Sequence, residues 1–172
     1  MRLYRTRIPV IASKIVSALI SDRDIAVDRA HVEDVELDIR AIIEEYLRTE
    51  QKVVEKTREI MEKQGLSYSE FAKTKRQVAE QNNLVTGDEA FYWLAGQIVE
   101  SFMIGSHVED VYSPDNVLRR KIVTVFRDNL VDEAELDKEV RSRMKNLAEG
   151  TPEWKLEYNR VLKQVRQRRG LI

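Results

Sequence analysis

Residues 34–64 show helical periodicity throughout and contain neither Gly nor Pro. Their apolar side chains recur at steps of three and four, which places them on one face of an α-helix. They are Val35, Ile39, Ile42, Ile43, Tyr46, Val53 and Ile60. Charged side chains fill the opposite face, and Gly65 should end the helix after roughly 45 Å. So long a helix must be covered by several shorter helices or by a second subunit.

The composition of the 172 residues favours an all-α fold. Charged residues make up 34% and apolar ones 42%, with six Gly and three Pro, which is typical of helical proteins. The absence of Cys excludes disulfides and Cys-based zinc sites. No apolar run reaches membrane-spanning length and no export signal is apparent, so a cytoplasmic protein without membrane contact is expected.

Capping signals divide the chain into a bundle of six or seven helices. Helix starts are indicated at Pro9, Ser67 with Glu70, 86–89, Ser113 with Pro114, Asp132 with Glu135, and Thr151 with Pro152. A second long helix should break near Val131 and Asp132. Residues 24–28 alternate as a strand would, but they are few and are expected to be an ordered connector.

Residues 90–104 are the most apolar segment of the chain. Because they are apolar on more than one face, this helix is expected at the centre of the core. The aromatic cluster Phe91, Tyr92 and Trp93 is then predicted to be buried, and a ligand pocket is the alternative.

The two halves of the chain resemble each other weakly. Sliding residues 14–61 onto 97–144 gives seven identities in 48 positions, against about three expected by chance. Examples are Ile39 with Ile122 and Arg58 with Arg141. The predicted organisation is an N-terminal half, 1–83, and a C-terminal half, 84–172, packed as one globular unit. Shared helical periodicity without duplication is the alternative.

Several motifs along the chain are similar to those of one bacterial family. They are Met1-Arg2-Leu3-Tyr4 with Arg7-Ile8-Pro9, Glu45-Tyr46-Leu47, Gly87-Asp88-Glu89-Ala90, Leu136-Asp137 with Glu139-Val140-Arg141, and Glu149-Gly150-Thr151 with Trp154 and Glu157-Tyr158. With these residues, nearly the whole chain resembles the family of uncharacterised proteins named domain of unknown function 507. The resemblance implies a bacterial cytoplasmic protein. It implies no activity, and it supplies no catalytic residue.

Both histidines, His31 and His107, open the same pentapeptide His-Val-Glu-Asp-Val. A histidine with two carboxylates within three residues can bind a divalent metal. Neither copy has the helical i, i+4 histidine pair of a metalloprotease, however, and acids near a helix start are favoured by the helix dipole. We therefore predict residues at helix starts, and no metal or cofactor.

No motif indicates catalysis. Neighbouring carboxylates such as Glu44 and Glu45 point in different directions on a helix, so a shared proton is not expected. The glycines are scattered singly, which excludes a Gly-rich phosphate loop, and no nucleophile motif is present. The protein is expected not to be an enzyme.

The ends of the chain are basic and its body is acidic. Residues 1–14 hold four basic and no acidic side chains, residues 160–172 hold five and none, and the whole chain has a net charge of −1. If the ends meet, they can bind phosphate, and Tyr4 can stack on a base. The candidate contacts are Arg2, Arg5, Arg7, Lys163, Arg166, Arg168 and Arg169. Solubility and a favourable helix dipole are the ordinary explanation for such charges.

Two functions are compatible with these features. The first is a non-catalytic helical interaction or adaptor protein, whose long apolar face pairs with itself or with a helix of a protein partner. The alternative is a nucleic-acid-associated protein that binds phosphate through its basic ends. The order of helices in each half is similar to a fused pair of histone folds, but no residue motif supports that likeness, and the acidic body argues against wrapping a duplex.

Overall fold

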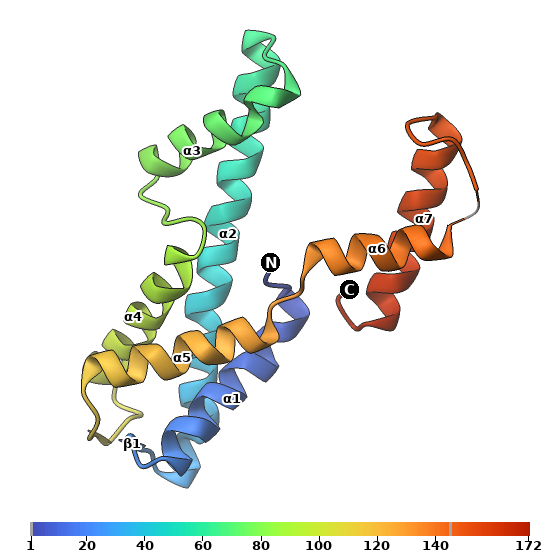
Figure 1. The fold of residues 1–172 in the computed structure, drawn as a ribbon. Helices are drawn as coiled ribbons and strands as arrows, with labels where there is room; N and C mark the ends of the chain where they lie inside the picture. The colour runs from blue at the N-terminus through green and yellow to red at the C-terminus, as the bar shows by residue number, and fades with distance from the viewer. Residues whose placement is uncertain (1, 145) are drawn as a thin grey trace.

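The part of the chain that the structure describes is built almost entirely from helices. The computed structural model describes residues 2–144 and 146–172 (Figure 1). Its helices are α1 (Ile8–Ser21), α2 (Val32–Gln64), α3 (Phe71–Gln81), α4 (Glu89–Ile104), α5 (Asp115–Asn129), α6 (Glu133–Arg143) and α7 (Pro152–Arg168). The predicted all-α fold is confirmed. None of these helices combines the length and the apolar character needed to cross a bilayer.

The predicted long helix is α2, which extends over 33 residues. It ends at Gly65, whose φ of 62° lies in the left-handed region that glycine adopts without strain. Ile39 and Ile43 are fully buried in the main core with residues of α1 and α4, and Val53 is buried against α3. The apolar face is therefore covered by shorter helices of the same chain.

Helices α1, α2, α4 and α5 form a four-helix body around one core. Helix α1 packs against α2 and α5, while α4 packs against α5 and α2. The largest fully buried side chains of this core are Ile8, Ile11, Ile15, Leu19, Ile39, Ile43, Leu94, Ile98, Leu118, Ile122 and Phe126. Helices from both halves of the sequence thus share one core. The first half contributes α1 and α2, and the second half contributes α4 and α5.

A small antiparallel sheet joins the connection between α1 and α2 to the connection between α4 and α5. Strand β1 (Ile25–Ala26) lies within the predicted connector and pairs with β2 (Asp110–Val111), which the sequence did not indicate. The neighbouring Asp24 is only 3% exposed and accepts hydrogen bonds from Ser113 Oγ at 2.6 Å and Lys121 Nζ at 2.7 Å. These bonds fix the connector against α5.

Helix α4 buries one face rather than several. Leu94 and Ile98 are fully buried and Phe91 packs against the core, whereas Tyr92 and Trp93 remain 49% and 40% exposed. The prediction of a buried aromatic cluster is therefore wrong for Tyr92 and Trp93. The reason is that α4 packs on α5 and α2 with one side, and Tyr and Trp tolerate a half-exposed position because each carries a polar group.

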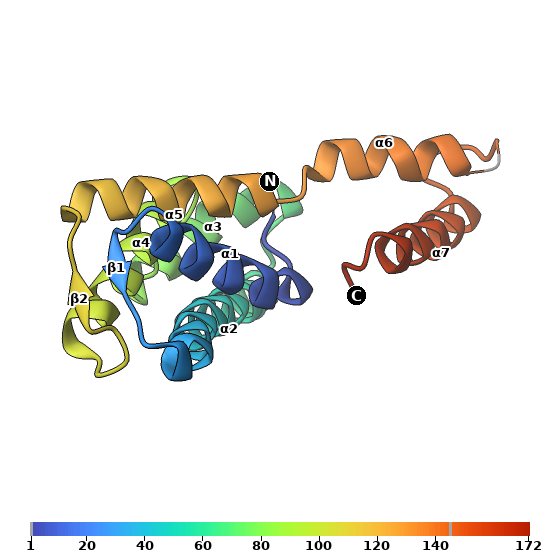
Figure 2. The same ribbon diagram turned by 90° about the horizontal axis from the view of Figure 1, so that it is seen from below.

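Helices α6 and α7 form a hairpin with a core of its own. Helix α5 ends at Asn129 and α6 begins after the capping residue Asp132, so the predicted break is confirmed. Helix α6 continues roughly in line with α5, and α7 folds back beside it (Figure 2). The hairpin core comprises Tyr4, Val131, Leu136, Val140, Val161, Val165 and Leu171. Arg2 pairs with Val131 through two backbone hydrogen bonds, of 2.8 and 3.0 Å, which tie the N-terminal segment to the hairpin.

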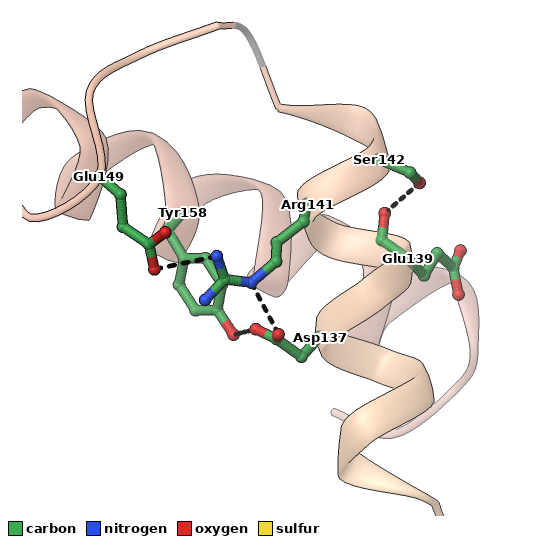
Figure 3. A network of polar contacts seen from close by, with 6 residues as sticks. All are labelled: Asp137, Glu139, Arg141, Ser142, Glu149 and Tyr158. Carbon is green, nitrogen blue, oxygen red and sulfur yellow. Dashed lines mark hydrogen bonds and ion pairs between the residues drawn. The ribbon is translucent and has the colours of Figure 1, made fainter.

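A polar network fixes α6 to α7 (Figure 3). Asp137 accepts hydrogen bonds from Tyr158 Oη and from Arg141 Nε, each at 2.7 Å. Arg141 also donates to Glu149 Oε1 at 2.9 Å, and its guanidinium lies 5.4 Å from the centroid of the Trp154 ring. The two helices and the turn between them are thereby held together.

Candidate interaction groove

The basic ends of the chain meet in space. Arg7 Nη2 donates a hydrogen bond to the carbonyl oxygen of Arg169 at 3.3 Å. The guanidinium carbons of Arg2 and Arg166 lie 5.1 and 5.7 Å from the centroid of the Tyr4 ring. Tyr4 itself is only 7% exposed, so its ring is not open to stacking on a base as the sequence suggested.

Four of the seven basic residues proposed as phosphate contacts are exposed and have no acidic partner in the described part of the chain. They are Arg2, Arg5, Lys163 and Arg168. Arg166 and Arg169 instead lie in ion pairs with Glu133 and Glu139 of α6, and Arg7 is half-buried. The structure thus brings Arg2 to Arg166 and Arg7 to Arg169, and it leaves four of the seven residues exposed without an acidic partner among the described residues.

A groove of about 1150 Å³ lies between α2, the N-terminal segment and the C-terminal hairpin. Its floor is a face of α2 whose residues repeat at steps of four and three: Leu47, Gln51, Val54, Arg58 and Met61. Leu47, Val54 and Met61 are half-buried, because the core covers the adjoining face of the helix. Phe71 adds apolar surface to the wall. The apolar floor extends over about 21 Å of helix.

Basic side chains outnumber acidic ones around this groove, by five to three. Lys75 is paired with Glu50 at 3.5 Å, whereas Arg5 and Arg58 have no acidic partner among the residues that the structure describes. The groove therefore combines an apolar row on α2 with an excess of positively charged side chains in its lining. That combination suits a ligand with an apolar stripe and acidic flanks.

The residues of α2 that form the groove floor were not predicted from the sequence. The apolar pattern of this helix predicted a single face, which the structure buries in the four-helix body and under α3. Leu47, Val54 and Met61 lie seven residues apart, which is the spacing of a second apolar row along a helix. That spacing is a local signal that would have identified them.

The two histidines lie face to face, although 75 residues separate them in the sequence. Their ring centroids are 5.5 Å apart, with 27° between the ring planes. His31 Nδ1 lies 2.9 Å from Asp34 Oδ2, and His107 Nδ1 lies 2.9 Å from Asp38 Oδ2. The hydrogen bond with Asp34 raises the pKa of His31 and lowers that of Asp34. The predicted position at a helix start is confirmed for His31 and wrong for His107, which lies between α4 and β2.

Comparison with known proteins identifies a family. The sequence model of the family described as protein of unknown function (DUF507) matches residues 1–171. The chain belongs to this family. No curated protein matches it. The resemblance indicated by the sequence motifs is confirmed, and membership of DUF507 assigns no activity.

In this DUF507 protein, the motifs at the two ends of the chain lie around the hairpin. Arg2 and Tyr4 attach the N-terminal segment to α6. The later motifs supply the polar network between α6 and α7, namely Asp137, Arg141, Glu149, Trp154 and Tyr158. Arg2 and Tyr4 therefore join the hairpin to the N-terminal segment, and the later motifs hold its two helices together.

Proposed function

We propose that this DUF507 protein is a non-catalytic helical adaptor that binds an amphipathic helix of a partner protein in the groove beside α2. The groove carries the proposal, because its apolar floor lies on a single helix and its lining includes Arg5 and Arg58, which have no acidic partner among the described residues. A helix laid along another helix contributes one apolar row, and the floor presents the matching row at Leu47, Val54 and Met61.

The length and charge of the groove define the partner helix. The distance from Leu47 to Met61 corresponds to about 21 Å, or roughly four turns of a helix. Arg5 and Arg58 have no acidic partner among the described residues, so acidic side chains beside the apolar row would pair with them. The preferred occupant is thus a segment of about 14 residues with an apolar face and acidic flanks.

Site-specific crosslinking tests this proposal. A photoreactive amino acid at position 54 faces the groove, and the same group at the exposed position 59 of α2 serves as the control. Crosslinks made in the native host should come from position 54 and should map by mass spectrometry to one acidic amphipathic helix. Crosslinks that are equal at both positions, or that map to a second copy of this chain, would contradict the proposal.

Binding of the mapped segment then tests the chemistry of the groove. Arg58→Glu reverses a charge that lines the groove, and Lys56→Glu makes the same change at an exposed α2 residue that does not line it. Arg58→Glu should weaken binding about tenfold or more, which is about 1.4 kcal/mol, while Lys56→Glu should have little effect. Equal effects of the two variants would show that only the net charge matters.

The meeting of the basic ends supports a second candidate, nucleic-acid binding through phosphate. Arg2, Arg5, Lys163 and Arg168 are the accessible cations for such contacts. Labelled RNA and duplex DNA should then bind at about 50 mM salt, with an affinity that falls as salt rises. Replacing these four residues by Ala should abolish binding. Failure to bind at low salt would remove this candidate and leave the adaptor proposal untouched.

A further inference from the structure

His31 and His107 are the only histidines of the chain, and the fold brings them together from two separate connections. His31 immediately precedes α2. His107 lies two residues before Glu109, whose backbone N–H donates to the carbonyl oxygen of Ala26 at 2.9 Å next to the pairing of β1 with β2. The small sheet therefore places the second connection beside the start of α2. Neither histidine lines the groove or lies in the basic ends of the chain.

The cluster has the composition of a metal site, and its ligand atoms lie near the spacing that one ion requires. His31, His107 and Asp34 each offer a ligand atom, and these three atoms lie within 4.8 Å of one another. Two ligand atoms bound to one Zn²⁺, each about 2.1 Å from the ion, are separated by about 3.0 to 3.4 Å. The three side chains are 49%, 34% and 43% exposed, so rotation at the surface can close the difference.

The surroundings favour a cation and orient one ligand. Asp28 and Glu109 are close enough to act electrostatically on His31, in addition to Asp34. Asp38 lies against Nδ1 of His107, which leaves Nε2 as the ring nitrogen without that contact. A carboxylate on the far nitrogen of a histidine ligand is the usual arrangement that fixes the ring and its tautomer in metal sites.

We propose that His31, His107 and Asp34 bind one divalent transition-metal ion of the Zn²⁺ class, and that Asp38 positions His107 for it. Imidazole and carboxylate ligands suit Zn²⁺, and three protein ligands leave a fourth position for water or for a group from a partner. The ion would join the N-terminus of α2 to the connection between α4 and β2. It would thereby cross-link the two halves of the four-helix body.

The test uses the full chain, stripped of metal with a chelator and titrated with Co²⁺, whose visible absorption reports the ligand set. One Co²⁺ should bind per chain, and Zn²⁺ should displace it. His31→Gln and His107→Gln should each abolish binding, while Glu44→Gln, which removes a carboxylate elsewhere on α2, should leave it unchanged. Co²⁺ bound equally well by the two histidine variants, or no binding to the parent protein at about 1 mM, would overturn the proposal.

Thermal unfolding separates ligand loss from misfolding. All of these side chains are partly exposed, so the metal-free variants should melt at the temperature of the metal-free parent. Added Zn²⁺ should raise the melting temperature of the parent and of Glu44→Gln but not of the histidine variants. Asp38→Asn should weaken Co²⁺ binding about 10- to 100-fold without changing the metal-free melting temperature, as expected for a positioning residue. Unchanged affinity in this variant would remove the role given to Asp38.

Discussion

Asp137 is the residue at which the polar contacts of the C-terminal hairpin converge. Its carboxylate accepts hydrogen bonds from Tyr158 of α7 and from Arg141, one turn further along α6. The bond from Tyr158, followed by that from Arg141, lowers the pKa of Asp137, because both bonds favour the ionised carboxylate. Burial and the same bond raise the pKa of Tyr158 to about 12. The contact therefore needs a charged aspartate and a neutral phenol.

The stability of the hairpin should consequently depend on pH at both extremes. Because its pKa is lowered on folding, the stabilisation from Asp137 is present above its ordinary pKa of 3.8 and is lost as the pH falls below that value. Because its pKa is raised, the stabilisation from Tyr158 is present below its ordinary pKa of 10.0 and is lost as the pH rises towards 12. Urea unfolding measures the free energy of unfolding of each protein. The difference between the parent and Asp137→Asn should become smaller at acidic pH, and the difference between the parent and Tyr158→Phe should become smaller at alkaline pH.

Ser142 supplies a control for this pH dependence. Its hydroxyl donates to the carbonyl oxygen of Glu139, a contact between groups that do not titrate. Any stability difference between the parent and Ser142→Ala should stay constant with pH. If the difference in free energy of unfolding between the parent and Asp137→Asn stayed constant down to about pH 2, the carboxylate would contribute nothing through its charge.

At the scale of elements, α2 carries two surfaces with different roles. Ile39 is fully buried in the body, where α1 and α4 cover it. Val54, four turns further on, lies on the groove floor and is only half-buried. One face of this helix therefore supports the fold, and the other remains available to a ligand.

Alanine substitutions on the two faces of α2 should separate these roles. Ile39→Ala leaves a cavity in the core and should reduce the free energy of unfolding by about 2 to 5 kcal/mol in urea titrations. Val54→Ala removes atoms that are already partly exposed to solvent, so it should reduce the free energy of unfolding by less than about 1 kcal/mol. A cost for Val54→Ala as large as that for Ile39→Ala would mean that position 54 belongs to the core.

The sequence predicted those elements whose signals are local. Gly65 ends α2, and the hydroxyl of Thr151 caps α7 by accepting from the Trp154 N–H at 3.2 Å, because capping acts within a few residues. Strand β2 was missed because two residues carry no periodicity and its pairing depends on the distant residues of β1. The exposure of Tyr92 was missed for a similar reason, since the buried side of α4 is chosen by the position of α5.

At the scale of the whole molecule, two cores are joined through adjacent residues of the N-terminal segment. Leu3 is buried in the core of the four-helix body, while Tyr4 is buried in the core of the hairpin and donates to Glu133 at 2.6 Å. The position of the hairpin, and with it the groove, therefore depends on this segment. Such long-range placement also brings Arg7 to Arg169, and no local pattern in the sequence indicates it.

Removing the Tyr4 side chain should loosen the hairpin and spare the body. Tyr4→Ala should cost about 3 kcal/mol of hairpin stability, so amides of α6 and α7 should exchange about 100-fold faster with solvent. Amides of α1 and α4 should keep the protection that they have in the parent. Hydrogen exchange measures both, with Tyr68→Ala, at an 85% exposed residue, as the control. Uniform acceleration along the chain would show that the two cores unfold as one.

The position of Tyr4 in the hairpin core also affects the order in which the protein folds during synthesis. Synthesis proceeds from the N-terminus, so Tyr4 leaves the ribosome long before Glu133 and Leu171, which complete its surroundings. The four-helix body can fold as soon as α5 emerges, while the aromatic ring of Tyr4 is still exposed to solvent. Closure of the hairpin core is then the last step, and it should be slow for a helical protein because it joins residues far apart in the sequence.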